Sequence, residues 1–388
     1  MNRDLAIDAT RGVAIWSMIT AHFATGTPLA WPTHAFPYVD GMSVFVLLSG
    51  FVLGLVHQRW TAREGLRYAY WRLLKRIVVL YLCQFAIAVV AVAAAVTHHR
   101  WLTRLPRVKG WKQGIELALT MDYLPSGGNI LLLYLVLMLM ACGVLVLLHY
   151  GWWCPVLIAS LALYAVSQLA APDWFYLTRY PTGGHSENWA AWQFVFIPAM
   201  VLGWRWNRWR GASFVDRWLG PIIAAAIVVA LAFHFIIDTG PLAHLEPDLA
   251  DKINFAPARA VGAPIAVAAV YGAFRAIGRR SRHNWLRPLV MTGGRSLDSY
   301  VLQATALVVI PINVAHRPWA PVTCGAVTLL VFLSCWGWAE LRAQAGIDKL
   351  HRVPLIIVRS LPWARPSLSI GSASQSPPPT PPTTGEHR

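Results

Sequence analysis

Three ionisable residues, Asp8, Arg11 and His22, lie in the first apolar stretch of the sequence. Ionisable groups are costly inside a membrane helix, so they mark function or a compensating pair. On an α-helix, Arg11 and His22 fall within about 20° of one face and roughly 16 Å apart along the axis. Asp8 shares that face and can pair with Arg11 three residues away. Alone, His22 would read as an interfacial polar residue. With the other two it predicts proton transfer, because histidine can take a proton from a hydroxyl near neutral pH.

The second apolar stretch begins at Asp40 and contains Ser49-Gly50-Phe51. We expect Asp40 to lie at the same level as His22, where it could orient the imidazole or set its charge. Gly50 would let another helix approach closely, as small residues do in membranes. Simple helix packing is the plainer interpretation of Ser49.

Amide and aromatic residues open the sixth apolar stretch, where Tyr180 begins the run YPTGG and Asn188, Trp192 and Gln193 follow. The last three share one broad helical face. Amide and indole groups beside a Gly/Pro loop suit sugar hydroxyls, which need hydrogen bonds and an aromatic platform. The alternative is an aromatic belt at the membrane interface with a capping asparagine.

Basic residues stand near both predicted membrane boundaries. Lys252, Asn254 and Arg259 precede or open the eighth apolar stretch, on the external side. Arg259 opposes the usual bias of positive charge toward the cytoplasm, so it needs a carboxylate, a phosphate or an anionic substrate as its partner. On the cytoplasmic side, Arg72 and Arg76 are explained by that bias alone, or they could bind the phosphates of a coenzyme A donor.

The composition predicts a membrane protein. Apolar residues are 56% of the chain and charged residues 13%, against roughly 25% charged in a soluble domain. The 20 tryptophans suit interfacial belts. The net charge of +16 comes from basic residues between the apolar stretches, which is typical of membrane topology and not of a nucleic-acid-binding face. The predicted spans lie near 5–25, 38–57, 77–97, 130–149, 153–171, 189–206, 219–238, 259–277, 298–314 and 320–341.

The sequence therefore predicts an all-α, polytopic bundle of about ten transmembrane helices in the inner membrane. Most Lys and Arg residues fall on one set of loops, which places both termini in the cytoplasm. The membrane domain is expected over residues 1–345, followed by a basic juxtamembrane segment at 346–365. Residues 366–388 are rich in Pro, Ser and Thr and are expected to be a disordered tail. No metal site is expected.

These residues resemble a known family. The pair Arg11 and His22, and Ser49-Gly50-Phe51, resemble motifs of the acyltransferase-3 superfamily of membrane acyltransferases. YPTGG…ENWAAWQ (180–193) and DKINFAPAR (251–259) resemble signatures of its OpgC branch, and the likeness extends over about residues 2–340. The resemblance implies transfer of an acyl group, such as succinyl, from cytosolic acyl-CoA to a hydroxyl of a periplasmic glucan or another envelope glycan. Acyl-CoA is then a donor substrate, and no bound cofactor is implied.

The resemblance also implies roles for the individual residues. His22 would act as a general base or a transient acyl carrier, with Asp8 or Asp40 setting its charge state. Arg11 would line the inner half of a donor channel, and Lys252 or Arg259 would face the second carboxylate of a succinyl group. The acceptor site would be shaped by Asn188, Trp192, Gln193, Asn254 and Arg259.

A transporter or flippase for a sugar- or acyl-containing substrate is the alternative function. Several spans with polar residues inside the membrane fit that class as well. However, the spans show no visible repeat and no paired Gly/Pro interruptions, which transporter folds often carry.

Overall fold

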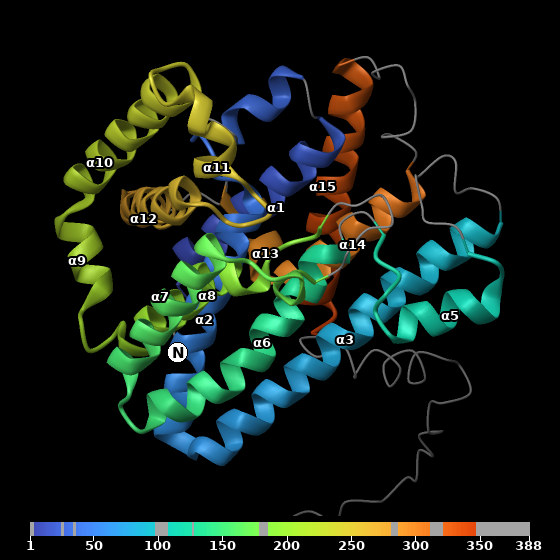
Figure 1. The fold of residues 1–388 in the computed structure, drawn as a ribbon, viewed down its shortest axis with the longest axis horizontal. Coiled ribbons are helices and arrows are strands. Elements are labelled where there is room, and N and C mark those ends of the chain that lie inside the picture. The colour runs from blue at the N-terminus through green and yellow to red at the C-terminus, as the bar shows by residue number, and fades with distance from the viewer. Residues whose placement is uncertain are drawn as a thin grey trace, which may run out of the picture. The chain divides into compact units, whose positions relative to one another are not determined.

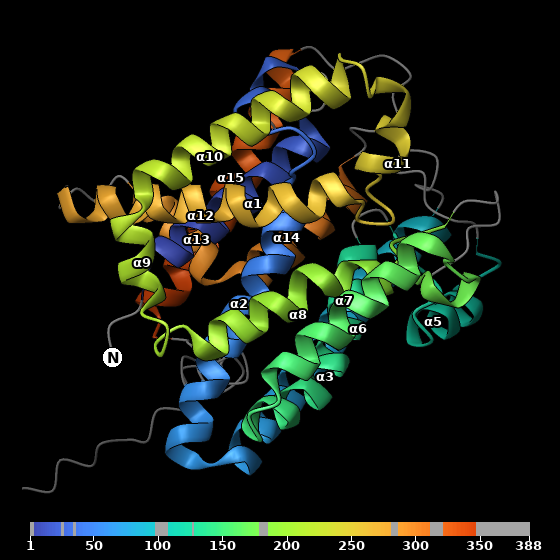
Figure 2. The same ribbon diagram turned by 60° about the vertical axis from the view of Figure 1, so that its left-hand side comes forward.

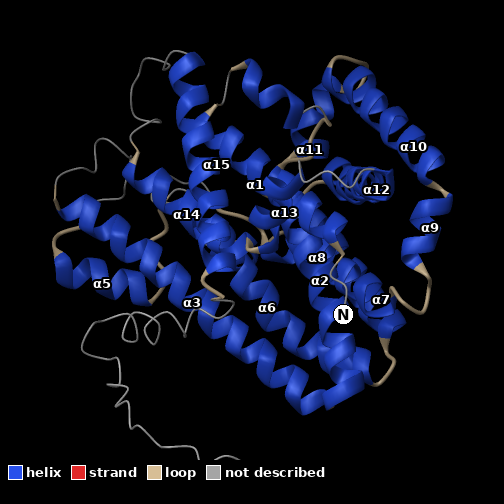
Figure 3. Cartoon of the chain, turned by 180° about the vertical axis from the view of Figure 1, so that it is seen from behind, coloured by secondary structure: helices blue, strands red, loops and turns tan. Residues whose placement is uncertain are grey.

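A computed structural model describes residues 4–24, 27–33, 36–97, 108–125, 128–177, 185–280, 286–310 and 321–346. Their regular secondary structure is helical, as the sequence predicts (Figure 3), with one isolated β-bridge between Tyr176 and Asn188. The chain separates into Met1–Glu340 and Leu341–Arg388. The described part of the second unit is the end of one helix, so the predicted tail at 366–388 lies outside the described residues.

Six helices in the described part of the chain are long and apolar enough to cross a membrane. They are α2 (Gly41–Glu64), α3 (Leu66–Val96), α6 (Gly128–His149), α10 (Leu219–Ala232) with the π-helical turn η3 (Phe233–Asp238), α12 (Pro257–Arg280) and α15 (Pro321–Gln344). Each coincides with a predicted span.

The other four predicted spans coincide with shorter or more polar helices. Two are short apolar helices, α7 (Trp153–Leu169) and α14 (Ser296–Val309). The remaining two are α1 (Leu5–Phe23) and α8 (Trp189–Arg205). The structure thus supports a multi-pass membrane protein, while the count of ten spans stays a prediction. The remaining helical elements are α5 (Trp111–Leu119), α9 (Gly211–Arg217), α11 (Glu246–Ala250), α13 (Arg287–Gly294), η1 (Pro28–Thr33), η2 (Asp173–Phe175) and η4 (Ala243–Leu245).

Helix α1 is an interior helix of the first unit. It contacts α2, α12, α13 and α14, and Figures 1 and 2 show it enclosed by other helices. Its closest contact is with α13, where Gly12 meets the carbonyl of Leu289 and Gly293 meets the carbonyl of Asp8. Because protein surrounds α1 on most sides, its sequence can carry more polar residues than a lipid-facing helix.

Helices α2 and α8 run parallel and touch through glycine (Figure 2). Gly50 faces the carbonyl of Phe196, and Gly54, one turn later, faces that of Met200. Gly203 of α8 in turn faces the carbonyl of Phe51. The expectation that Gly50 admits a close neighbour is confirmed. A parallel pair in this register places the N-termini of α2 and α8 at the same level.

The beginning of α1 is joined to α9 and α12 by a network of ion pairs and hydrogen bonds. The Arg275 guanidinium lies 2.7 Å from Asp216 and 3.3 Å from Asp4. Tyr271 donates a hydrogen bond of 2.8 Å to Asp4, and Arg279 also pairs with Asp216. Hydrogen bonds from Arg275 hold the pKa of Asp216 below its usual value, although partial burial opposes that shift. The network fixes α12 beside the beginning of α1.

Candidate functional site

Asp40 is the N-cap of α2. Its Oδ1 accepts hydrogen bonds from the Ser43 backbone N–H, at 2.9 Å, and from the Ser43 hydroxyl, at 2.8 Å. Its Oδ2 lies 2.7 Å from Nζ of Lys252 and 3.9 Å from Nη1 of Arg259. The Asp40 side chain is largely buried, at 16% exposed, whereas that of Lys252 is 48% exposed. One carboxylate therefore caps a helix and holds two cations.

Arg259 links the segment before α12 to the segment before α2. It donates hydrogen bonds of 2.7 Å to the carbonyl oxygens of Ala250 and Tyr38, and Asp40 is its nearby carboxylate. The anionic partner expected for Arg259 is thus present within the protein. Two of its donors are therefore used by backbone oxygens of the protein, so Arg259 holds these two segments together.

His22 lies in the last turn of α1 and is half-buried. The charges of Lys252 and Asp40 both act on its imidazole. His22 therefore lies close to the ion pair that joins α2 to the segment before α12.

Glu187, which the sequence reasoning missed, belongs to the same group. It precedes the N-cap of α8, and Asp40 and Lys252 act electrostatically on its carboxylate. Burial raises its pKa, a hydrogen bond with Asn129 opposes the rise, and Oε2 has no hydrogen-bond partner among the described residues. In the sequence, the position of Glu187 beside Asn188 in ENWAAWQ could have marked it as a candidate site residue. An acidic residue outside an apolar stretch does not by itself indicate a functional site.

The two OpgC-like segments are bound to each other. The Asn188 side chain caps α8 by accepting from the Ala191 N–H at 3.1 Å, and it donates to Asn254 at 3.1 Å. Asn254 also receives the Tyr176 hydroxyl at 3.0 Å and donates to Asp251 at 2.6 Å. The polar groups of Asn188 and Asn254 are therefore engaged inside the protein, where they hold the Lys252 segment against the start of α8.

Trp192 and Gln193 also lie inside the bundle. Trp192 is fully buried, with its ring centroid 4.6 Å from that of Phe255. Gln193 accepts a hydrogen bond of 2.6 Å from the Ser160 hydroxyl and donates one of 2.8 Å to the Ser160 carbonyl. Gln193 thus joins α7 to α8. The buried Trp192 ring is no open platform for a sugar, but its Nε1 has no partner within the described ranges.

Several other buried polar atoms near Glu187 have no hydrogen-bond partner in the described part of the chain. They belong to the carboxamides of Gln84, at both its oxygen and its nitrogen, and of Gln303, at its oxygen. Both side chains are 1% exposed. Buried groups of this kind usually find a partner in protein, water or ligand, so each needs an explanation.

Contacts between neighbouring helices connect these groups to His22. Gln84 lies beside Gly128, next to Asn129, which binds Glu187. The charge of Glu187 acts on the buried Tyr300, one turn before Gln303 on α14. The Gln303 amide in turn lies 3.9 Å from the Met18 sulfur, one turn before His22. Side chains of α1, α3, α6 and α14 are therefore linked by successive contacts to Glu187, which precedes α8.

The remaining candidates on α1 and α2 lie deeper in the bundle. Asp8 and Arg11 are buried where α13 packs on α1, and the Arg11 guanidinium lies 6.0 Å from the Phe45 ring centroid. The predicted ion pair between Asp8 and Arg11 stays a prediction. The hydroxyl of Ser49 is buried without a partner among the described side chains. Ser49 lies about 13 Å from Asp40 along α2.

Arg72 and Arg76 contact aromatic rings. The Arg72 guanidinium lies 4.7 Å from the Trp60 ring centroid, and Arg76 donates a hydrogen bond of 3.3 Å to Tyr134. These contacts of Arg72 and Arg76 do not involve His22. Tyr180 lies outside the described residues. Within the described ranges there is no cluster of three His, Cys, Asp or Glu side chains placed to hold a metal ion.

Comparison with known proteins supports one family. No curated protein and no solved structure matches the chain. The family described as OpgC protein matches residues 3–346, which include every described helix and both segments that meet at Asn188 and Asn254. The chain therefore belongs to the OpgC protein family.

Proposed function

We propose that the protein is a membrane O-acyltransferase that moves an acyl group, such as succinyl, from cytosolic acyl-CoA to a hydroxyl of an extracytoplasmic glucan or other envelope glycan. Membership of the OpgC family supports a membrane enzyme that modifies glucans. The acyltransferase-3 resemblance of Arg11 and His22 supports the reaction class. The proposal places the protein in the inner membrane with both termini in the cytoplasm.

The observation that carries the proposal is the ion pair of Asp40 and Lys252, whose charges act on both His22 and Glu187. A base, two carboxylates and a cation there provide groups for proton transfer and for holding an anionic acyl group. The buried amides of Gln84 and Gln303 add donors and acceptors that a polyhydroxylated substrate could use.

In the reaction that we propose, the imidazole of His22 accepts the proton of the glycan hydroxyl. The hydroxyl oxygen attacks the thioester carbonyl, an ester C–O bond forms, the C–S bond breaks, and the thiolate of coenzyme A leaves. The proton passes from His22 to that thiolate or to solvent. A covalent route through an acyl-histidine uses the same base position in two steps.

The surrounding charges have separate roles in this proposal. Asp40 stabilises the protonated form of His22 and fixes Lys252. The half-exposed Lys252 ammonium faces the second carboxylate of a succinyl group. Arg72 and Arg76 interact with the phosphates of the donor, and Arg11 lines its path.

The test compares envelope glycans by mass spectrometry in a deletion strain carrying wild type, His22→Ala or His149→Ala, before and after mild base. His149 is an exposed histidine at the end of α6 and serves as the matched control. Base-labile acyl increments are expected with wild type and His149→Ala and not with His22→Ala at equal protein levels. Increments that persist in His22→Ala would refute the role of His22. Glycans unchanged by the deletion itself would favour the transporter.

A further inference from the structure

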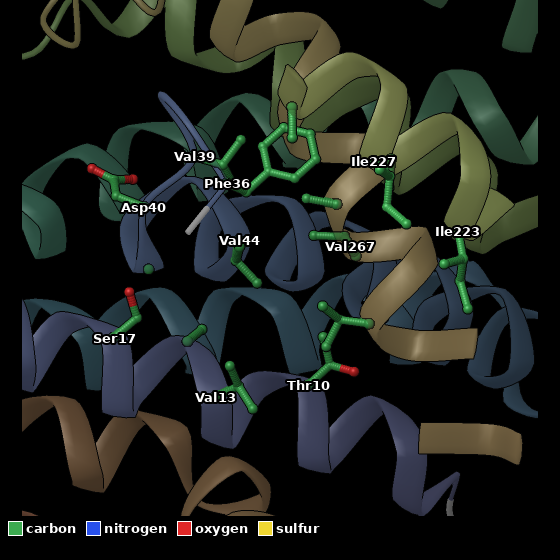
Figure 4. Close-up of a pocket in the computed structure, with 16 residues that line it drawn as sticks. Thr10, Val13, Ser17, Phe36, Val39, Asp40, Val44, Ile223, Ile227 and Val267 are labelled. Carbon is green, nitrogen blue, oxygen red and sulfur yellow. The ribbon is translucent and has the colours of Figure 1, made fainter. Parts of the chain in front are cut away.

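An apolar groove of about 320 Å³ opens between α1, α2, α10 and α12 (Figure 4). Val13 of α1 and Val44 of α2 form its floor, and Ile227 of α10 and Val267 of α12 form its sides. Among the described residues that line it, Asp40 is the one with an ionisable side chain, and it stands at one end. The groove therefore leads from an apolar wall to the carboxylate that holds Lys252.

The groove is open although small residues line it. Ala14, Ala226, Ala230 and Ala266 face it from three helices. Small residues at such positions normally let membrane helices close on each other. An opening here therefore requires α10 to be held away from its neighbours.

Aromatic rings hold α10 away at one end. Phe36, from the segment before α2, packs edge-on against Phe233, with ring centroids 6.3 Å apart. Both rings lie over Gly262 of α12. At the other end, Leu219 closes on Gly272 of α12. Between these two fixed points the helix spans the groove, and Figure 4 shows Phe36 at its rim.

The open side of the groove continues into the apolar surface of α10. Ile227 is 55% exposed and the neighbouring Val228 63%. This helix is one of the candidate membrane spans and buries little of its surface in the protein. The groove thus opens sideways, toward the hydrocarbon of a bilayer, and bilayer hydrocarbon contains no water to fill it.

The walls suit an alkyl chain better than a sugar. Apart from Asp40, the described part of the lining offers two hydroxyls, those of Thr10 and Ser17. Thr10 donates its hydroxyl to the carbonyl of Ala6 within its own helix, at 2.8 Å. From Ile223 to Ala230 the groove follows α10 for about 10 Å, the shape of an extended chain and not of a ring.

We propose that this groove binds one acyl chain of a membrane glycerophospholipid, which enters from the bilayer past α10 and ends beside Asp40. The inference is independent of the acyl transfer proposed above. It rests on the groove, its lateral opening and its lining, and would stand if the chemistry at His22 were different.

The test uses the full chain in nanodiscs that contain a glycerophospholipid with a photoreactive diazirine in one acyl chain. After irradiation, peptide mass spectrometry maps the adducts. The expected adducts fall on Val13, Val44 and Val267 inside the groove. Ala230→Trp fills the groove, whereas Ala225→Trp adds the same ring to the exposed side of α10. Adducts at Val13 and Val44 are expected to fall severalfold in Ala230→Trp and to persist in Ala225→Trp.

Two results with the lipid probe would overturn the inference, and a third would come from a sugar probe. One is adducts confined to exposed residues such as Val228, with none at Val13 or Val44. The other is labelling of Val13 that is equal in wild type and Ala230→Trp. A water-soluble diazirine glycoside that labels Val13 in place of the lipid would also contradict it. If Ala230→Trp fails to fold, Ala266→Trp fills the groove from α12 and carries the same expectation.

Discussion

The ammonium of Lys252 lies 2.7 Å from Oδ2 of Asp40 and thereby joins the segment before α12 to the start of α2. The pair also stands beside His22 at the end of α1, since both charges act on the imidazole. Three parts of the chain that are distant in sequence thus meet at one ion pair. Lys252 is half-exposed, so solvent screening limits the contribution of the pair to stability, and its larger effect is expected on chemistry.

Asp40→Asn is expected to reduce acyl transfer strongly and to change stability little. Asparagine still caps a helix, the half-exposed Lys252 can turn to solvent, and Arg259 keeps its hydrogen bonds to the carbonyls of Ala250 and Tyr38. Asp40→Ala removes the cap as well, which costs about 1 kcal/mol more. Glycan acylation and thermal unfolding in detergent, measured on both variants, check this. Equal acylation in wild type and Asp40→Asn would show that the charge of Asp40 is not needed.

Glu187→Gln should stabilise the protein increasingly as the pH rises while lowering its activity. Burial raises the pKa of Glu187 above 4.5, so the folded state favours the protonated form. The contribution of protonated Glu187 to the stability of the folded state is complete below the unfolded pKa and is lost as the pH rises through the folded pKa. Glutamine does not titrate, so the variant does not lose this contribution. The difference in melting temperature between variant and wild type should therefore grow as the pH rises above about 4.5. A difference that does not change with pH would contradict the burial of Glu187.

Gly50→Val should separate α2 from α8 and disturb the site at their shared end. A side chain at Gly50 would meet the carbonyl of Phe196, and overpacking typically costs 1–3 kcal/mol, so about that loss is expected. Gly143 of α6 faces open space, and Gly143→Val is the control, expected to be close to neutral. Thermal unfolding and acylation are measured on both. Wild-type stability in Gly50→Val would mean that the two helices do not touch there.

Asp216→Asn should remove part of the acid sensitivity of the fold. Arg275 and Arg279 lower the pKa of Asp216 below 3.8, so the network stabilises the folded state above the unfolded pKa. That contribution is lost as the pH falls through the folded pKa. Wild type is expected to lose more stability on acidification than Asp216→Asn, as followed by unfolding in detergent. Asp248→Asn, at an exposed position in α11, is the control and is expected to lose as much stability on acidification as wild type. Identical acid profiles for wild type and Asp216→Asn would argue against the network.

Much of the fold follows from local patterns. Long apolar runs predict helices because a buried backbone must satisfy its own hydrogen bonds, and the six long apolar helices coincide with predicted spans. The helix α1 coincides with the predicted span at 5–25, but its surroundings were not predicted, because protein and not lipid covers it. Its contact with α13 depends on Gly12 and Gly293, which meet across a long sequence separation that no local pattern reveals.

The site was predictable only in part, for a similar reason. Ionisable residues such as His22 and Asp40 stand out at the ends of apolar stretches. Arg259 is predicted at the external membrane boundary, against the usual bias of positive charge, so an anionic partner was expected, and Asp40 supplies it. Glu187 and Gln84 acquire their importance only from burial by other helices. The groove under α10 likewise depends on Phe36 meeting Phe233, a contact between segments that composition and periodicity do not connect.

The proposed transfer of an acyl group with the help of His22 is tested most directly with purified protein in proteoliposomes, isotopically labelled succinyl-CoA and a periplasmic glucan. Base-labile label on the glucan is the measured quantity. Labelled ester is expected with wild type and with His149→Ala, and none above background with a His22→Ala protein that unfolds at the wild-type temperature. Ester formation by His22→Ala at the wild-type rate, or no ester with folded wild type, would contradict the proposal.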